Sequence, residues 1–148
     1  MMEIVKMTAD HVAQVAAIEK ECFGREGWSE RSVAGELTND LALWLVAVEG
    51  GTVAGYVGSQ TVCGETDMMN VAVTANYRRR GIAEKLVLEL VERLKAIGSH
   101  CLTLEVRASN EPAQALYQKL GFAQVGLRPK YYQNPREDAL ILRKEWLI

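Results

Sequence analysis

The segment that most constrains the fold of this chain runs from Gly81 to Gly98. Between these two glycines, leucine and isoleucine recur every three or four positions, at Ile82, Leu86, Leu90, Leu94 and Ile97. This period predicts an amphipathic helix with one apolar face, and glycine is typical of the position just past a helix C-terminus. Because such a helix is stable only when its apolar face is covered, the rest of the chain has to supply a sheet or further helices.

Short apolar runs bounded by turn residues predict the strands that provide this cover. They span residues 2–7, 41–48, 53–62, 66–73, 101–106, 122–127 and 139–143. The apolar stretch at 68–73 is typical of a strand that is covered on both faces. Further helices are predicted after Thr8, Ser29 and Asn110, whose side chains are common N-caps.

The predicted order of elements is β-α-α-β-β-β-α-β-α-β-β, which indicates an α/β fold with a mixed central sheet and helices on its faces. The 148 residues contain no stretch that resembles a linker, so we expect a single domain over residues 1–148. The apolar run at 41–48 is far shorter than the roughly 18 residues that a membrane-spanning helix needs. Since no signal-peptide pattern is recognisable either, we expect a cytoplasmic protein with no membrane partner.

Composition narrows the possible partners. The formal net charge is −2 and the pI is about 5.8, so the chain is a poor candidate for binding nucleic acid through its phosphates. The three cysteines are widely spaced and form no CxxC pair, which argues against a disulfide framework or a zinc site. We therefore expect neither a metal nor a nucleic-acid partner.

One stretch, residues 70–83, has a pattern that suggests a ligand. A predicted strand runs into a polar loop with three arginines, and the loop leads directly into the long helix. Free N–H groups at a helix N-terminus, together with the helix dipole, favour bound phosphate. The pattern is neither a Walker loop nor a GxGxxG motif, and by itself it fits an ordinary turn with solvated arginines equally well.

In context, Arg78, Gly81 and Ala83 resemble the Gln/Arg-x-x-Gly-x-Gly/Ala acetyl-CoA signature of the GNAT superfamily of N-acetyltransferases. Residues 104–110 (LEVRASN) and 115–122 (ALYQKLGF) resemble a second block of the same superfamily, at the expected separation. The resemblance implies a mostly antiparallel sheet that is splayed at its middle strands, with helices on both faces. It also implies acetyl transfer from acetyl-CoA, without a metal.

Within the superfamily, the Tyr131-Tyr132 pair and residues 136–140 (REDAL) resemble the ribosomal-protein-alanine N-acetyltransferases. Trp28-Ser29 matches a Pro-Trp-Ser element of that subfamily, except that Gly27 replaces the proline, which we expect to loosen the loop. The implied acceptor is the N-terminal alanine of small-subunit ribosomal protein eighteen. Two alternatives stay open: a GNAT enzyme for another amine, such as a lysine, a small amine or another protein N-terminus, and a non-catalytic acyl-CoA-binding module.

The resemblance also implies roles for individual residues. Glu105 corresponds to the general base and Tyr117 to the general acid. The implied donor-binding residues are Val71, Ala72, Val73, Arg78, Arg79, Arg80, Gly81, Ile82, Ala83, Glu84 and Asn110. The implied acceptor-binding residues are Trp28, Tyr131 and Tyr132, the two tyrosines being expected in a loop between the last strands.

Each of these side chains also has a plain structural explanation. Glu105 could be a partner of Arg107, and Tyr117 could be a core aromatic at helical spacing. Tyr131 and Tyr132 could be surface packing. Acidic side chains in the first helical region could attract a basic N-terminal tail or form a solvated face; they are Glu21, Glu26, Glu30 and Asp40.

Overall fold

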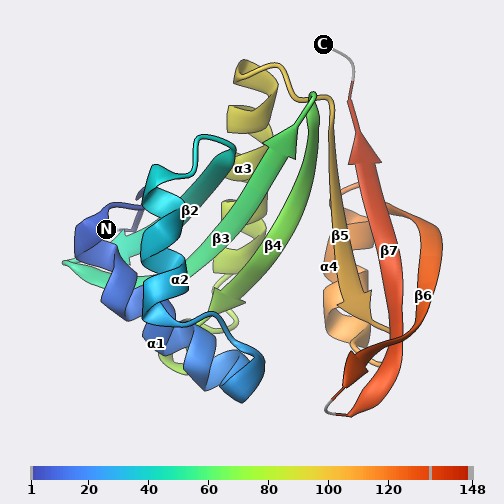
Figure 1. Cartoon of the computed structure of the whole chain (residues 1–148), viewed down its shortest axis with the longest axis horizontal. Coiled ribbons are helices and arrows are strands. Elements are labelled where there is room, and N and C mark those ends of the chain that lie inside the picture. The colour runs from blue at the N-terminus through green and yellow to red at the C-terminus, as the bar shows by residue number, and fades with distance from the viewer. Residues whose placement is uncertain (1, 134, 147–148) are drawn as a thin grey trace.

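A computed structural model describes residues 2–133 and 135–146 of the chain (Figure 1). These residues form one sheet, with strand order β1-β2-β3-β4-β5-β7-β6. The strands are β1 (Glu3–Lys6), β2 (Ala42–Glu49), β3 (Thr52–Val62), β4 (Glu65–Val73), β5 (Cys101–Arg107), β6 (Ala123–Gln133) and β7 (Arg136–Glu145). The helices are α1 (Val12–Phe23), α2 (Glu30–Gly35), α3 (Ile82–Ala96) and α4 (Glu111–Lys119). The order predicted from the sequence is confirmed.

The sheet is splayed between β4 and β5. These two strands are parallel and pair only where Glu65–Asp67 lies beside Cys101–Thr103, whereas every other neighbouring pair is antiparallel. Beyond this short contact the two strands part, as Figure 1 shows. The predicted mostly antiparallel, splayed sheet is therefore confirmed.

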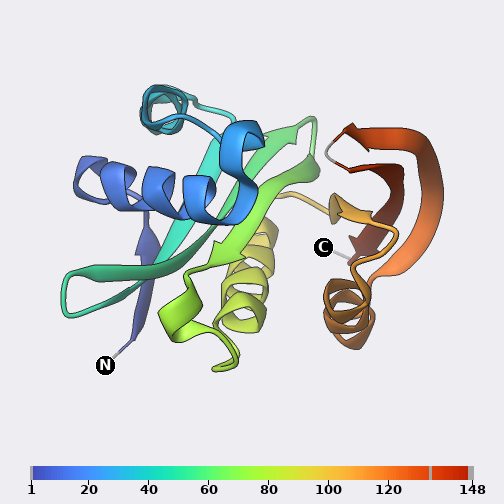
Figure 2. The same ribbon diagram turned by 90° about the horizontal axis from the view of Figure 1, so that it is seen from below.

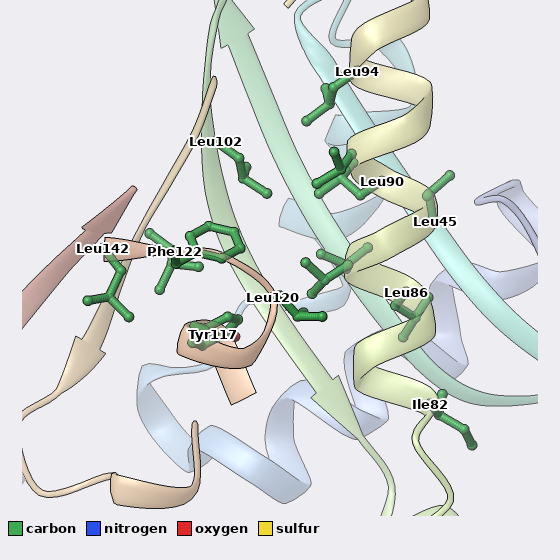
Figure 3. Close-up of a cluster of buried hydrophobic side chains, with 14 of the residues drawn as sticks. Leu45, Ile82, Leu86, Leu90, Leu94, Leu102, Tyr117, Leu120, Phe122 and Leu142 are labelled. Atoms are coloured by element: carbon green, nitrogen blue, oxygen red, sulfur yellow. The ribbon is translucent and has the colours of Figure 1, made fainter. Parts of the chain in front are cut away.

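Helices cover both faces of the sheet. Figure 2 shows α1 and α2 on one face and α3 and α4 on the other. The larger hydrophobic core lies under α3 and α4, and Figure 3 shows side chains from α3, α4 and β5 directed toward one another, among them Leu90, Leu102 and Tyr117. A second core lies between α1 and the first strands and includes Val15 and Tyr56.

A bulge interrupts β4 beside the splayed region. Gly58 of β3 pairs with Asn70, but the next residue, Ser59, pairs with Met68, so Met69 is an extra residue in β4. An extra residue reverses the side-chain alternation of everything beyond it. The bulge therefore decides which face the rest of β4 presents to its neighbours.

The structure corrects the predicted loop between the last two strands. Strands β6 and β7 pair almost to the end of their hairpin, so Tyr131 and Tyr132 lie on β6 rather than in a loop. A register shift lies between Arg128 and Tyr132, where Lys130 has a positive φ of 53°. The polar and aromatic residues of this exposed hairpin do not alternate with apolar ones, so the sequence contains no strand pattern here. The strand forms because β6 pairs with β7.

Two further expectations about burial are wrong. Residues 68–73 of β4 are only partly buried, because one edge of the strand borders the splayed region instead of another strand. Ile97 is 63% exposed, since α3 has already ended at Ala96.

Candidate active site

A cleft occupies the splayed region between β4 and β5, with a volume of about 470 Å³. Its walls come from the two strands, from α4 and from the C-terminal end of α1. The predicted site residues that line it are Val71, Ala72, Val73, Arg78, Ala83, Glu105, Asn110, Tyr117 and Tyr132. The fold therefore brings most of the predicted donor-binding residues together with both predicted catalytic residues.

The edge of β4 presents main-chain N–H groups to this cleft. The N–H group of Thr74 donates to the carbonyl of Ala54 on β3, 2.9 Å away. Because successive N–H groups of a strand point in opposite directions, those of Val73 and Val71 point away from β3 and toward the cleft. The cleft thus has two oriented donors along one wall.

The loop after β4 borders a second hollow at one end of the cleft. A hollow of about 210 Å³ there is lined by Arg79, Gly81, Ile82, Ala83 and Glu84, among others. Gly81 is exposed, has a φ of +74°, and no atom lies within 4 Å of where its Cβ would be. A left-handed conformation of this kind strongly favours glycine.

Helix α3 begins at this loop without a side-chain cap. The side chains of Ser29 and Asn110 cap α2 and α4, but no side chain accepts from the first N–H groups of α3. The free N–H groups and the helix dipole therefore face the hollow, which suits a phosphate.

The three arginines of the loop differ in their surroundings. The Arg78 guanidinium turns back to the protein, where Nε donates to the Val73 carbonyl at 3.1 Å and Nη2 lies 3.7 Å from Glu21. Arg80 lies over the ring of Tyr77, 5.0 Å from its centroid. Arg79 lines the hollow and has a φ of +66°. The guanidiniums of Arg78 and Arg80 therefore have partners in the protein, and Arg78 and Arg79 both line the hollow.

Glu105 reaches into the cleft from β5. Its neighbours Leu104 and Val106 belong to the core under α3 and α4, so Glu105 points to the opposite face of the sheet. One carboxylate oxygen lies 3.7 Å from Nε of Arg128. The other is buried and has no hydrogen-bond partner among the described residues. A buried acceptor without a donor is rare in proteins and is typical of a functional position.

The predicted structural partner of Glu105, Arg107, makes other contacts. Its guanidinium donates to Glu137 at 3.0 Å, lies 3.7 Å from Glu26, and lies over the ring of Tyr132 at 4.3 Å. Glu137 belongs to β7 and Glu26 to the turn after α1. Arg107 therefore connects the two parts of the chain that flank the cleft.

Tyr117 is both a core residue and a cleft residue. It is 5% exposed and packs edge-on against Phe122, with ring centroids 5.4 Å apart. It also lines the cleft, so the two sequence interpretations of this residue are compatible. Burial raises the pKa of Tyr117, which keeps its hydroxyl protonated and able to donate.

The aromatic residues expected to bind the acceptor occupy two different places. Tyr132 lines the cleft, and burial raises its pKa to about 12. Tyr131 lies next to Tyr132 on β6, and a hydrogen bond to Glu105 raises the pKa of Tyr131. Trp28 instead lines a separate hollow of about 600 Å³ beside α1 and α2, and packs edge-on against Trp44.

The acidic side chains of the first helical region are also dispersed. Glu26 lines the cleft, and Glu30 lines the hollow that contains Trp28. Glu21 accepts hydrogen bonds from Thr74 and Ala75 at the start of the loop after β4. Of these, Glu26 is the one placed beside the cleft.

Gly27 is tightly packed, which corrects the expectation that it loosens its loop. A Cβ at this position would lie 2.7 Å from the main-chain oxygen of Glu19. Its N–H group donates to the carbonyl of Gly24 at 3.2 Å, a bond that a proline would lose.

The sequence interpretation missed Glu19, Asn70 and Cys22. Glu19 is a fully buried carboxylate on α1, and it accepts hydrogen bonds from Asn70, which lines the cleft. An acid at a position of the apolar stripe of α1 was the available signal. Cys22 also lines the cleft, beside Arg78, and burial raises the pKa of its thiol.

Over residues 2–133 and 135–146, no helix is long and apolar enough to cross a membrane. In the same part of the chain, histidine, cysteine and acidic side chains form no group of three that could hold a metal ion.

A splayed sheet, a strand edge with free N–H groups and an uncapped helix N-terminus together describe a known class of enzyme. The chain belongs to the acetyltransferase (GNAT) family, whose family model matches residues 12–122. This chain is 37% identical over 117 residues to the [ribosomal protein bS18]-alanine N-acetyltransferase of Escherichia coli strain K12. The aligned region covers 78% of each of the two chains. This chain is also 31% identical over 144 residues to the N-alpha-acetyltransferase RimI of Mycobacterium tuberculosis. That aligned region covers 94% of this chain and 89% of the other protein.

Solved structures agree with this family. The crystal structure of the ribosomal-protein-S18-alanine N-acetyltransferase from Escherichia coli matches with a TM-score of 0.91 and 31% identity. The match covers 100% of this chain and 96% of that one. The fold expected from the sequence resemblance is thereby confirmed.

Proposed function

We propose that this chain transfers the acetyl group of acetyl-CoA to the N-terminal α-amine of a protein. We propose further that the acceptor is the N-terminal alanine of ribosomal protein bS18. The names of the relatives from Escherichia coli and Mycobacterium tuberculosis support this reaction class, and the first of them supports the acceptor. The observation that most strongly supports this proposal is that Glu105 and Tyr117 line the same cleft, between the parted strands β4 and β5.

The surroundings of the cleft fit acetyl-CoA as donor. The uncapped N-terminus of α3 and the open space at Gly81 suit the pyrophosphate. The free N–H groups of Val71 and Val73 suit the amide-rich pantetheine arm, and they are oriented to stabilise negative charge on the thioester oxygen. The cap residue Asn110 lines the same cleft.

The chemistry is a direct attack of a neutral amine on the thioester. A free α-amino group has a pKa of about 7.7–8.0, so part of it is neutral near physiological pH. Glu105, one oxygen of which has no hydrogen-bond partner in the described part of the chain, takes the proton that the amine loses as the amide bond forms. Tyr117 gives its proton to the departing CoA sulfur, and the resulting amide and thiol leave separately.

Two substitutions test the catalytic assignment. Glu105→Gln and Tyr117→Phe are each expected to lower turnover by roughly 10²–10⁴-fold, the usual contribution of general acid–base catalysis, with acetyl-CoA binding largely retained. Glu145→Gln, an exposed carboxylate on β7, is the control and should behave like the wild type. Wild-type turnover in both cleft variants would remove the assignment.

The acceptor is tested by mass spectrometry. A peptide that copies the N-terminus of bS18 should be acetylated on its α-amine, and the same peptide with a different first residue should react more slowly. Faster acetylation of a lysine side chain or a polyamine would replace the acceptor proposed here. Binding of CoA with no product from any amine would indicate a non-catalytic module.

A further inference from the structure

A buried carboxylate lies directly behind the cleft. Glu19 of α1 is fully buried, and hydrogen bonds reach it from three separate parts of the chain. The Tyr56 hydroxyl on β3 donates at 2.5 Å, and the Trp28 main-chain N–H donates at 3.1 Å. The Asn70 amide on β4 donates to both oxygens, at 2.9 and 3.2 Å. All of these donors are neutral, so the carboxylate is stabilised by hydrogen bonds rather than by an ion pair.

This carboxylate fixes the orientation of the Asn70 side chain. An amide has one donor end and one acceptor end, and a carboxylate can only accept. The Nδ2 end must therefore face Glu19, which directs Oδ1 away from it. Within the described residues, Oδ1 of Asn70 has no hydrogen-bond partner, and Asn70 lines the cleft. Donation to a carboxylate also polarises the amide and strengthens its oxygen as an acceptor.

The bulge in β4 brings Asn70 level with Glu105. The last pair between the two strands is Asp67 with Thr103, and Glu105 lies two residues further along β5. Met69 is the extra residue of the bulge, so Asn70 occupies the corresponding position on β4. Since Asn70 contacts α1 and Glu105 points to the face on which α1 lies, the two side chains flank the same side of the cleft.

We infer that Asn70 binds the amine of the acceptor, through a hydrogen bond from the α-amino group to Oδ1, opposite the general base Glu105. Glu19 is then a positioning residue that acts through Asn70. The inference rests on the proposed function, because it names the group that recognises the amine in that reaction. An ammonium or amine offers several N–H donors, and Oδ1 of Asn70 and one oxygen of Glu105 are acceptor atoms of this cleft that have no donor among the described residues.

The test is steady-state kinetics of Asn70→Ser and Asn70→Ala with the bS18-type peptide as acceptor. Serine keeps a hydroxyl that can donate toward Glu19 but lacks the amide oxygen. This variant therefore separates the loss of the amide oxygen from the loss of the contact with Glu19. We expect kcat/KM for the peptide to fall roughly 10- to 100-fold, the loss typical of a hydrogen bond to a charged group. The KM for acetyl-CoA should stay within about twofold of wild type.

Asn39→Ser is the matched control. Its Nδ2 also donates to a carboxylate, that of Glu36 at 3.1 Å, but Asn39 does not line the cleft. This variant should leave both KM values unchanged. If Asn70 has only a structural role, its substitution should raise the KM for acetyl-CoA as much as that for the peptide, because Val71 and Val73 lie on the same strand.

A double-mutant cycle with Glu19→Gln tests the positioning role. A glutamine at this position no longer dictates which end of the Asn70 amide faces it, so Glu19→Gln should itself lower kcat/KM for the peptide. Adding Asn70→Ser should then have little further effect, whereas independent roles would give additive losses.

The possible failures can be told apart. If the wild type acetylates no α-amine, the proposed function fails and this inference fails with it. If the wild type acetylates the peptide and Asn70→Ser does so with unchanged kcat/KM, the inference alone is overturned.

Discussion

Two glycines occupy positions that reject a side chain for different reasons. Gly81 is needed for its backbone conformation, a φ of +74° in open space. Gly27 has an ordinary φ of −71° but is packed against the main chain of Glu19. The first position lies in the hollow beside the N-terminus of α3 and the second in the hollow beside α1 and α2, so the two substitutions should have separable consequences.

Gly81→Ala is expected to lower the free energy of unfolding by about 1–2 kcal/mol, the cost of a left-handed residue other than glycine. It should also weaken CoA binding, because the strained loop carries the N–H groups that face the phosphate. Denaturant unfolding and calorimetric CoA titration measure the two effects. Gly35→Ala is the control, since Gly35 has a helical φ of −61° and no atom near its Cβ position, and it should be neutral or slightly stabilising.

Gly27→Ala is expected to destabilise the protein by about 1–3 kcal/mol, as overpacking against a fixed main-chain atom does. The methyl group has to displace Glu19, so kcat/KM for the peptide should fall while CoA affinity is retained. Unfolding midpoints and the same kinetic assay measure this, again beside Gly35→Ala. Normal stability and normal peptide kinetics would show that the loop accommodates the added methyl group without strain.

At the scale of whole elements, the C-terminal end of α1 is fastened to the loop that follows β4. Glu21 accepts from the Thr74 hydroxyl at 2.8 Å and from the Ala75 N–H at 3.0 Å, and Arg78 lies 3.7 Å away. The loop that leads to α3 is therefore held in place by a helix more than fifty residues earlier in the sequence. Such a contact is strongest when the carboxylate is charged.

The hydrogen bonds from Thr74 and Ala75 lower the pKa of Glu21 below its ordinary 4.5. A carboxyl group whose pKa is lower in the folded state stabilises the fold above its unfolded pKa, and this contribution is lost as the pH falls through the folded pKa. Glu21→Gln should therefore reduce stability at neutral pH and make no difference at a pH below the folded pKa. Unfolding midpoints of both proteins across this acidic range measure the effect, and a difference that is independent of pH would contradict it.

At the scale of the whole molecule, the two halves of the splayed sheet are held together mainly by the core beneath them. The direct contact of β4 with β5 is short, but the larger core combines Leu45 of β2, Leu90 of α3, Leu102 of β5 and Phe122. Figure 3 shows Leu90 of α3 between Leu45 on one side and Leu102 and Phe122 on the other. The cleft can therefore stay open because the halves are joined on the face away from α1.

Leu90→Ala should lower the free energy of unfolding by about 2–5 kcal/mol, the cost of removing a large buried side chain. Since the core spans both halves of the sheet, unfolding should remain a single transition. Leu88→Ala on the same helix is the control, because Leu88 is 45% exposed and its loss should cost little. Calorimetry measures both; two separate transitions in Leu90→Ala would mean that the halves unfold independently.

The order of elements, the helix from residue 82 and the family could all be predicted from local patterns in the sequence. Apolar periodicity and glycine positions are local signals, and the two GNAT-like blocks are contiguous in the chain, so neither depends on distant contacts. The roles of single site residues, the acceptor, the single domain and the cytoplasmic location remain predictions or proposals.

Which residues lie together in the site depends on contacts between distant segments of the chain. Tyr132 pairs with Glu137 of β7, which places it on a strand, and Trp28, predicted to bind the acceptor, lines a separate hollow beside α1 and α2. The bulge at Met69 and the contact of Glu19 with Asn70 follow from pairing and packing between segments far apart in the chain. A one-residue shift in register changes the face of every side chain beyond it, and no local pattern in the sequence specifies such a shift.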